Sequence, residues 1–220
     1  MPRYTKPGTE NLEVMHNRVS GTGSVIPHCV AGIDDGYFER DWSRTLMALA
    51  IHCWHGGRLC PCRLLLDTVT VDGLDATDVA ERLVRRALSE KLEIEALLTD
   101  TVVFAGFNIL DPIELHRRLG LPVIVVYWYP PRRKAVEKAL QLHFSDWKKR
   151  LGVIEEVWNR LKHVRCRRGS LLVAVYGADY AYAWSLVCSL QLFTRHPEPL
   201  FTAHRTASML SRVLGPFKDN

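Results

Sequence analysis

The chain has 220 residues, 47% of them hydrophobic, and a formal net charge of +5, which suits one α/β domain with a sizeable core better than two full domains. No apolar run approaches the roughly 18 residues that a membrane-spanning helix needs, and no apolar segment typical of a signal peptide precedes Val25. We therefore expect a cytoplasmic protein with no membrane partner. The six cysteines lie mostly in apolar segments, and in a reducing compartment we expect them to be small core residues.

The first part of the chain is polar and is followed by an apolar strand. Residues 1–24 contain several prolines and glycines and are predicted to form a flexible N-terminal arm or an edge segment, ahead of a single domain over residues 25–220. The apolar run then predicts a strand that begins at Val25 or Cys29, ends at Ile33 and is covered on both faces. Two acids, Asp34 and Asp35, follow this strand directly, although Asp34-Asp35-Gly36 would also suit a simple turn between strands.

The next two strands are predicted to form an antiparallel hairpin. They run from Thr45 to Trp54 and from Arg63 to Val71, and the turn between them is His55-Gly56-Gly57-Arg58. A zinc site at this hairpin is disfavoured, because the spacing of its His and Cys residues matches no common ligand pattern. These residues are His52, Cys53, His55, Cys60 and Cys62.

Helices and strands alternate from there on. Apolar residues at helical spacing predict a helix over Asp78 to Glu90, with Asp78 or Thr77 as its cap. A short strand over Ile94 to Leu98 stops before Asp100, and Asp111-Pro112 opens a helix that ends at Gly120. The pattern then predicts a strand over Leu121 to Trp128, basic helices from Arg132 to about Arg165, a strand over Ser170 to Tyr176, and helices over Tyr180 to Thr194 and from Glu198 to Gly215.

This order of elements predicts a mixed sheet flanked by helices, the topology of the ribonuclease H-like fold, with a basic helical segment after the fifth strand. In that topology the first and fourth strands are neighbours, so Asp34 and Asp100 should meet at one end of the sheet. Two adjacent carboxylates repel each other, and a divalent cation removes this repulsion. Oxygen ligands favour Mg²⁺ or Mn²⁺, so both acids are predicted to be catalytic metal ligands.

A third ligand is predicted in the segment that joins the hairpin to the first helix. Asp72 is the preferred residue for this catalytic and metal-binding role, although Asp72-Gly73 would also suit a simple turn. Asp75 is better explained as a helix cap and is kept as an auxiliary residue. Asp35, which adjoins Asp34, is another auxiliary candidate. So is Asn108, which would orient a substrate or a metal-bound water or else form a turn.

The positive charge is concentrated in residues 131–168, the segment predicted to be helical. Twelve Lys or Arg and four acids lie between Arg132 and Arg168, so this segment carries +8 and the remainder of the chain −3. Such segregation is typical of a surface that faces a polyanion. Trp147 and Trp158 are predicted to be core residues, because they fall at helical spacing with apolar neighbours. The residues predicted to contact nucleic acid are Arg132, Arg133, Lys148, Lys149, Arg165, Arg167 and Arg168.

Five short segments are informative when they are taken together. They are Gly32-Ile33-Asp34-Asp35-Gly36, Val71-Asp72-Gly73-Leu74-Asp75-Ala76-Thr77, Phe104-Ala105-Gly106-Phe107-Asn108, Leu121-Pro122-Val123-Ile124-Val125 and Pro197-Glu198-Pro199-Leu200-Phe201-Thr202-Ala203-His204. In this order they resemble an archaeal family of unknown function that is related to endonuclease V. The resemblance implies a ribonuclease H-like fold, metal-bound carboxylates and cleavage of DNA or RNA near deaminated bases.

The resemblance also assigns positions to individual residues. It places Asp34 and Asp100 at the family's first-strand and fourth-strand acids, and His204 in the Pro-Glu-Pro segment near the end, which makes His204 an auxiliary candidate. The chain differs from the motifs of endonuclease V in two places. The catalytic His of the Gly-His-Arg segment falls at Gly177-Ala178-Asp179, and the wedge that probes the damaged base has no counterpart.

These observations predict a nuclease-like protein that depends on Mg²⁺ or Mn²⁺ and cleaves phosphodiester bonds of DNA or RNA, of unspecified strandedness. The alternative is a catalytically inactive nucleic-acid-binding protein of the same fold, which agrees with the missing His and wedge. A third hypothesis is a small-molecule or protein-interaction domain that uses the end of the sheet as a ligand pocket.

Overall fold

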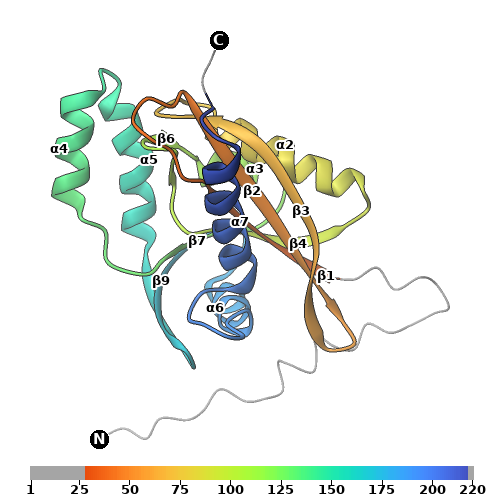
Figure 1. Ribbon diagram of the computed structural model, residues 1–220. Helices are drawn as coiled ribbons and strands as arrows, with labels where there is room; N and C mark the ends of the chain where they lie inside the picture. The colour runs from red at the N-terminus through yellow and green to blue at the C-terminus, as the bar shows by residue number, and fades with distance from the viewer. Residues whose placement is uncertain (1–27, 218–220) are drawn as a thin grey trace, which may run out of the picture.

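A seven-stranded mixed sheet with helices on both faces organises the computed structural model, which describes residues 28–217 (Figure 1). The strands are β1 (His28–Asp35), β2 (Arg44–His55), β3 (Arg58–Thr70), β4 (Glu93–Thr99), β7 (Val123–Tyr127), β8 (Lys162–Cys166) and β9 (Gly169–Tyr176), and β5 (Val103–Phe104) pairs with β6 (Asn108–Ile109) in a small separate ribbon. The helices are α2 (Ala76–Ser89), α3 (Pro112–Leu119), α4 (Arg133–His143), α5 (Trp147–Arg160), α6 (Tyr180–Ser189) and α7 (Glu198–Leu214). The arm predicted over residues 1–24 lies outside the described residues.

The strand order is β3-β2-β1-β4-β7-β9-β8, so β1 and β4 lie side by side in the middle of the sheet. β1 runs antiparallel to β2 and parallel to β4, and β4 runs parallel to β7. Ile33 of β1 is paired with Thr99 of β4, one residue before the acid on each strand. Because parallel strands end at the same side of a sheet, Asp34 and Asp100 are delivered to one place. This is the mixed α/β sheet that the order of sequence elements predicts.

Alternate side chains of β1 enter two different cores. Ala31 and Ile33 pack into the larger core, which α2, α3 and α5 cover, whereas Val30 packs into a second core with residues of α6 and Leu200 of α7. Ala203 and Ala207 of α7 pack against the alanines of β2. This explains why the segment from Cys29 onwards is continuously apolar: a strand that is covered on both faces cannot alternate apolar with polar residues.

The predicted hairpin is present, with Gly56 and Gly57 at its turn. Their φ angles are 55° and 77°, a left-handed conformation at both central positions that glycine adopts without strain. β3 starts at Arg58, earlier than the sequence predicts, and so includes Pro61. Proline is tolerated there because β3 is the outermost strand and its free edge needs no donor.

Helix α2 begins two residues earlier than predicted because its first turn is capped from a distant loop. The backbone N–H of Ala76 donates to Oδ1 of Asn108 at 2.9 Å, so neither Thr77 nor Asp78 caps the helix. By contrast, Asp111 caps α3 as the sequence predicts, accepting hydrogen bonds from the backbone N–H groups of Ile113 and Glu114.

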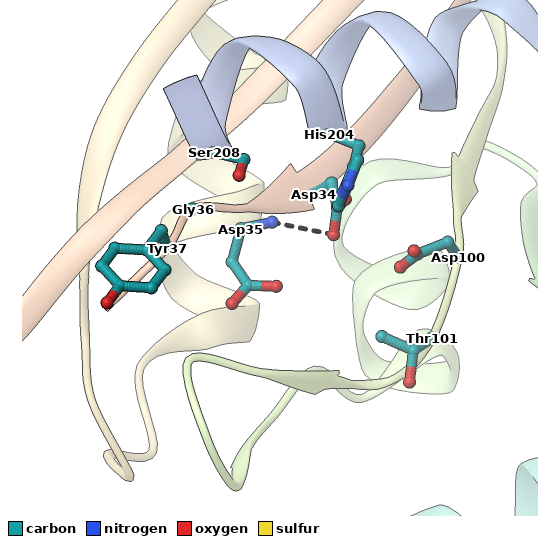
Figure 2. Close-up of a pocket in the computed structure, with 8 residues that line it drawn as sticks. All are labelled: Asp34, Asp35, Gly36, Tyr37, Asp100, Thr101, His204 and Ser208. Carbon is teal, nitrogen blue, oxygen red and sulfur yellow. Dashed lines mark hydrogen bonds and ion pairs between the residues drawn. The ribbon is translucent and has the colours of Figure 1, made fainter. Parts of the chain in front are cut away.

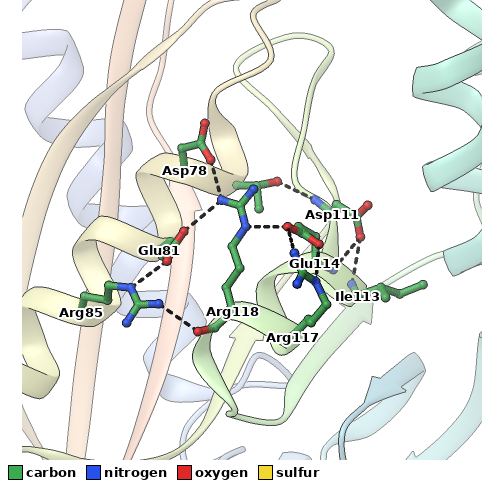
Figure 3. Close-up of polar contacts among 9 residues, drawn as sticks. Asp78, Glu81, Arg85, Asp111, Ile113, Glu114, Arg117 and Arg118 are labelled. Carbon is green, nitrogen blue, oxygen red and sulfur yellow. Dashed lines mark hydrogen bonds and ion pairs between the residues drawn. The ribbon is translucent and has the colours of Figure 1, made fainter.

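Helices α2 and α3 are joined by a network of charged side chains (Figure 3). The guanidinium of Arg118 on α3 donates to Asp78 and Glu81 of α2 and to Glu114 of its own helix. Asp78, predicted as a cap, is therefore a partner in an ion pair between helices. The network lies on the outside of the molecule, where each pair contributes little to stability.

The last part of the predicted basic helical segment is a strand. Residues 133–160 form α4 and α5, but Lys162–Cys166 form β8, which pairs with β9 at the edge of the sheet. The alternation in β8 places Val164 in the core while its neighbours are exposed. Trp158 is 4% exposed, and Trp147 is partly buried against the same core, which agrees with their prediction as core residues.

The prediction that all six cysteines are reduced is wrong for four of them. Cys29 lies directly opposite Cys53 in the β1–β2 ladder, and the two form a disulfide. Cys166 at the end of β8 forms a second disulfide with Cys188 of α6. Both pairs depend on strand register and helix position, which the spacing of cysteines along the chain does not reveal. Cys60 and Cys62 are free.

Among residues 28–217, no helix is both long and apolar enough to cross a membrane.

Candidate functional site

Asp34, Asp100 and His204 converge at the end of the central strands (Figure 2). One ligand atom of each residue lies within 4.8 Å of those of the other two. Nδ1 of His204 is 2.7 Å from Oδ2 of Asp34, and Oδ1 of Asp34 accepts a hydrogen bond from the backbone N–H of Asp35 at 2.9 Å. The structure therefore brings together the two acids that the topology predicts to be neighbours, and it adds a histidine. We call these three residues the acidic cluster.

Helix α7 carries His204 into this position because β1 has a glycine where the helix crosses it. A Cβ atom on Gly32 would overlap the backbone of Pro199 and Leu200 at the start of α7. Gly32 and Asp34 face the same side of the strand, so the helix that rests on Gly32 passes next to the Asp34 carboxylate. His204 lies one turn beyond Leu200 of α7, which is buried.

The acidic cluster lines a cavity of about 270 Å³. Its wall also contains Asp35, Gly36 and Tyr37 from the end of β1, Thr101 after β4, and Ser208 of α7 (Figure 2). Oδ2 of Asp35 accepts a hydrogen bond from the backbone N–H of Ala105 at 2.8 Å, which ties the end of β1 to the β5–β6 ribbon. The cavity is thus built from three segments that are far apart in the sequence.

Burial dominates the electrostatics of the three acids. It raises the pKa of Asp34 well above its ordinary value, and the Asp35 charge raises it further. Burial also raises the pKa of Asp100 well above its ordinary value, with the charge of Asp34 as the next cause. For Asp35, burial raises the pKa to about 7 against the lowering effect of the Ala105 hydrogen bond. A cation at this position would favour the charged form of all three carboxyls.

The donor groups fit a divalent metal ion. Asp34 is 3% exposed, and Oδ1 of Asp100 is buried with no hydrogen-bond partner among the described residues. A buried carboxylate oxygen without a donor is costly, and a cation is the partner that would satisfy it. Carboxylate oxygens suit Mg²⁺ and Mn²⁺, and Asp34, Asp100 and the His204 imidazole are the groups that would hold the ion.

Asp72, the predicted third ligand, lies elsewhere. Its φ angle is 56°, and its Oδ1 accepts a hydrogen bond from the backbone N–H of Phe107 at 2.8 Å. The side chain therefore holds the turn between β5 and β6, and it contributes neither to the acidic cluster nor to the cavity wall. The structure therefore does not place Asp72 with the two acids: the turn that follows β3 directs its side chain toward the β5–β6 ribbon.

Asp75 and Asn108 also have structural roles. Asp75 accepts hydrogen bonds from the backbone N–H and the hydroxyl of Thr70, and from the Asn108 side chain. Asn108 is fully buried, and its amide also donates to the backbone oxygen of Thr70. The two residues join the end of β3 to the start of α2, so of the auxiliary candidates only Asp35 and His204 line the cavity.

His204 is the residue whose importance the sequence conveys least. It is an auxiliary candidate through the resemblance alone, and the periodicity of α7 contains one further signal. Leu200, Ala203, Ala207 and Ser211 form the buried stripe of α7, and His204 lies one turn after Leu200, at the border of that stripe. A polar residue at such a border is common, so only the position of Asp34 shows what His204 contacts.

The predicted nucleic-acid-binding residues fall into two groups. Arg132, Arg133, Lys148 and Lys149 lie at the starts of α4 and α5, whereas Arg165, Arg167 and Arg168 lie on β8 and its turn to β9. All seven are exposed, but Arg133 donates to the backbone oxygen of Trp158, and Arg168 donates to the backbone oxygens of Gln191 and Phe193. Arg150, which adds to the charge of the segment, is buried and bonds to Asp146 and two backbone oxygens.

Comparison with known protein families identifies relatives over most of the chain. The family model described as endonuclease dU matches residues 28–211. A UPF0215 protein of Methanothermobacter thermautotrophicus is 33% identical over 181 residues, which are 81% of this chain and 85% of that protein. A UPF0215 protein of Aeropyrum pernix is 32% identical over 188 residues, 83% of this chain and 98% of that protein.

Solved structures share the fold. A protein of unknown function from Archaeoglobus fulgidus superposes with a TM-score of 0.69 at 24% identity and covers 83% of this chain and 97% of its own. Ciona intestinalis endonuclease V, in complex with DNA that contains an inosine followed by a ribo-adenosine, has a TM-score of 0.56 at 11% identity, with 85% and 86% covered. Human ENDOV has a TM-score of 0.53 at 15% identity, with 87% and 85% covered. The sheet is therefore of the ribonuclease H-like type.

Proposed function

The chain belongs to the endonuclease dU family, and from that premise we propose that it is a divalent-metal-dependent nuclease that hydrolyses phosphodiester bonds of DNA or RNA. The observation that supports this most is the acidic cluster, in which two buried carboxyls from neighbouring strands and one imidazole surround a point where a cation fits. The family description names dU, so a strand that contains deoxyuridine is the first substrate to test.

Each residue of the acidic cluster has a separate task in this proposal. Asp34 and Asp100 would hold the ion, which when bound would lower the pKa of water and neutralise charge on the phosphate. His204 donates to or accepts from Asp34 through Nδ1 and so orients that carboxylate. About 58% of the His204 side chain is exposed, and its other ring nitrogen, Nε2, would be available as a third ligand of the ion.

The direct experiment measures cleavage of labelled oligonucleotides. Single-stranded and duplex DNA and RNA, with and without deoxyuridine or deoxyinosine, are incubated with Mn²⁺, with Mg²⁺ or with EDTA. We expect strand cleavage with at least one metal and none in EDTA. Binding without cleavage in every metal would contradict the proposal and favour the inactive binding protein. Cleavage that persists in EDTA would contradict the role of the metal.

Without metal, stability should decrease as the pH rises. The folded acids hold protons that the unfolded chain has already lost, because burial raises the pKa of Asp34 and Asp100 and that of Asp35 to about 7, whereas an unfolded Asp titrates near about 4. The contribution of these groups to stability is therefore greatest below about pH 4 and falls as the pH rises through about 7. In EDTA, the melting temperature of Asp100→Asn should exceed that of wild type at about pH 8.

Added Mn²⁺ should reverse that order. At about 100 times the dissociation constant a ligand stabilises the native state by about 2.7 kcal/mol, which corresponds to roughly 5–10 °C in Tm for a chain of this size. We expect this rise at the same pH for wild type and little of it for Asp100→Asn. Equal shifts in the two proteins, measured by differential scanning fluorimetry, would place the metal at another site.

The alternative function, nucleic-acid binding without turnover, is favoured by one observation: Asp72 is outside the cluster, which among residues 28–217 consists of two carboxyls and a histidine. Both functions require phosphate contacts, which we assign to the exposed basic residues. Changing Arg165 and Arg167 to Gln should weaken binding of all sequences alike and reduce the slope of log K against log salt by about 1–2. An unchanged slope, measured by fluorescence anisotropy between about 50 and 200 mM salt, would contradict this assignment.

A further inference from the structure

Four aromatic side chains and an arginine gather beside the acidic cluster. Trp128 and Tyr129 follow β7, His196 lies in the loop before α7, and Phe201 lies in the first turn of α7. The ring centroids of Trp128 and His196 are 4.2 Å apart, and those of His196 and Phe201 are 6.2 Å apart. We call Trp128, Tyr129, Arg195, His196 and Phe201 the aromatic platform.

Tyr129 is the most accessible ring of the aromatic platform. Its side chain is braced by Arg195, whose guanidinium lies 4.7 Å from the ring centroid and donates to the Tyr129 hydroxyl at 2.6 Å. Tyr129 nevertheless remains 66% exposed, and Phe193, in the same loop as Arg195, is 79% exposed. Large apolar side chains that stay in solvent next to a site are typical of a surface that binds something. An aromatic ring supported by arginine is suited to stacking with a planar base.

The aromatic platform adjoins the acidic cluster. Phe201 precedes His204 by three residues on α7, so the two side chains lie on neighbouring positions of one helical face. A nucleic-acid strand whose bases stack on the aromatic platform would therefore have its phosphate backbone close to the acidic cluster.

A basic turn lies on the other side of the aromatic platform. Nε of Arg168 donates to the backbone oxygen of Gln191 at 2.9 Å, and its Nη1 donates to that of Phe193 at 3.3 Å. Gly169, the next residue, lies against the side chain of Arg195. The exposed Arg165 and Arg167 are thus close to the loop that carries Phe193 and Arg195. Aromatic rings that continue into a basic surface are the combination that binds single-stranded nucleic acid.

We propose that the aromatic platform stacks with unpaired bases of a bound strand next to the acidic cluster, so that the preferred ligand is a single-stranded or locally unpaired segment of nucleic acid. Within the platform Tyr129 offers an open ring, and Phe193 of the neighbouring loop adds a second. Arg195 holds Tyr129 in position, and the arginines of the β8–β9 turn contact the phosphates. The location of the scissile bond rests on the function proposed above. The stacking of bases does not, because it requires binding alone.

The test uses a single-stranded oligonucleotide that contains 2-aminopurine, with EDTA present so that no metal-dependent cleavage occurs. Stacking quenches the fluorescence of this base, and anisotropy of an end label gives the affinity. We expect wild type to quench the fluorescence and to bind the single strand more tightly than the matching duplex. Tyr129→Ala should weaken binding of the single strand about 10-fold and reduce the quenching, with the salt slope unchanged because no phosphate contact is lost.

Two control variants separate stacking from other effects. Tyr129→Phe keeps the ring and removes the hydroxyl, so it should bind within about 2-fold of wild type. Val213→Ala removes an apolar side chain that is 73% exposed near the end of α7, and it should leave affinity and quenching unchanged. Phe193→Ala is a second test of the proposal, since a side chain that is 79% exposed can be removed without loss of the core should Tyr129→Ala fail to fold.

Several results would overturn the inference. They are an affinity of Tyr129→Ala and Phe193→Ala equal to that of Val213→Ala, quenching that is unchanged in both, or no binding of wild type to any single strand at low salt. A loss of self-association in these variants without a change in nucleic-acid binding would assign the rings to a protein interface instead. If wild type binds and quenches but never cleaves, base stacking is upheld and the proposed nuclease activity is refuted. If wild type cleaves and both variants bind as it does, the nuclease activity is upheld and base stacking is refuted.

Discussion

Replacing Asp34 by asparagine should reduce metal-dependent cleavage by roughly 10³-fold or more. Asp34 is 3% exposed and contacts His204, so the substitution removes a ligand charge and changes the partner that orients the imidazole. The change is nearly isosteric, and because burial raises the pKa of Asp34 well above its ordinary value, a neutral side chain should be tolerated by the fold. Initial cleavage rates in Mn²⁺ measure the effect, and circular dichroism checks the fold.

Two further variants make this result specific. Asp67→Asn alters a half-buried carboxyl that pairs with Arg82 of α2 and does not line the cavity, so it should retain full activity. Asp72→Asn keeps an oxygen that can accept the hydrogen bond from Phe107, so it should retain most of the activity as well. A loss of activity in Asp72→Asn comparable to that in Asp34→Asn would restore Asp72 as a ligand. Full activity in Asp34→Asn would remove the acidic cluster from the mechanism.

Replacing Gly32 by alanine should both destabilise the protein and inactivate it. The added Cβ would overlap backbone atoms of Pro199 and Leu200, and backbone cannot rotate away as the end of a flexible side chain can. Overpacking of this kind costs about 3 kcal/mol or more, and relief requires α7 to move off the sheet. Because α7 carries His204, the same movement would separate the imidazole from Asp34. We therefore expect a fall in Tm of roughly 6–12 °C and loss of cleavage.

Gly152→Ala is the matched control for this substitution. Gly152 lies within α5, and a Cβ placed there meets no atom within 4 Å. Alanine in a helix is favoured over glycine by roughly 0.5–1 kcal/mol, so this variant should be slightly more stable than wild type and fully active. Denaturant unfolding followed by circular dichroism measures both variants. Equal stability of Gly32→Ala and wild type would show that the crossing of α7 over β1 is less tight than the structure indicates.

Much of the fold could be predicted from local patterns. The β1 strand is recognisable because both of its faces are buried, the hairpin because two glycines adopt positive φ, and α3 because Asp111 and Pro112 suit a helix start. Each of these features is decided by residues that are close together in sequence. Two of the predictions that were wrong concern contacts between distant segments: the cap of α2 comes from Asn108, and Cys29 forms a disulfide with Cys53. The β8 strand was missed although its partner β9 follows it directly, because only Val164 of its five residues is buried.

The acidic cluster also has one part that the sequence predicts and one part that it does not. That Asp34 and Asp100 meet follows from strand order, because a parallel pair of strands ends at one side of the sheet. The third member does not follow from it. Asp72 follows the end of a strand, and His204 lies at the border of the buried stripe of a helix. The sequence does not indicate which of the two side chains points toward Asp34.

The sequence by itself determined the alternation of strands and helices, the two central acids and the concentration of positive charge, because these depend on side-chain type and on spacing along one segment. Only the tertiary structure decided that His204 and not Asp72 joins the acids, that Cys29 pairs with Cys53, and that Tyr129 and Arg195 form one surface. Each of these contacts joins residues from separate elements. The geometry of these contacts is set by how α7, the loops and the strands pack on one another. The close approach of α7 to β1 shows this, because it is possible only where Gly32 has no side chain.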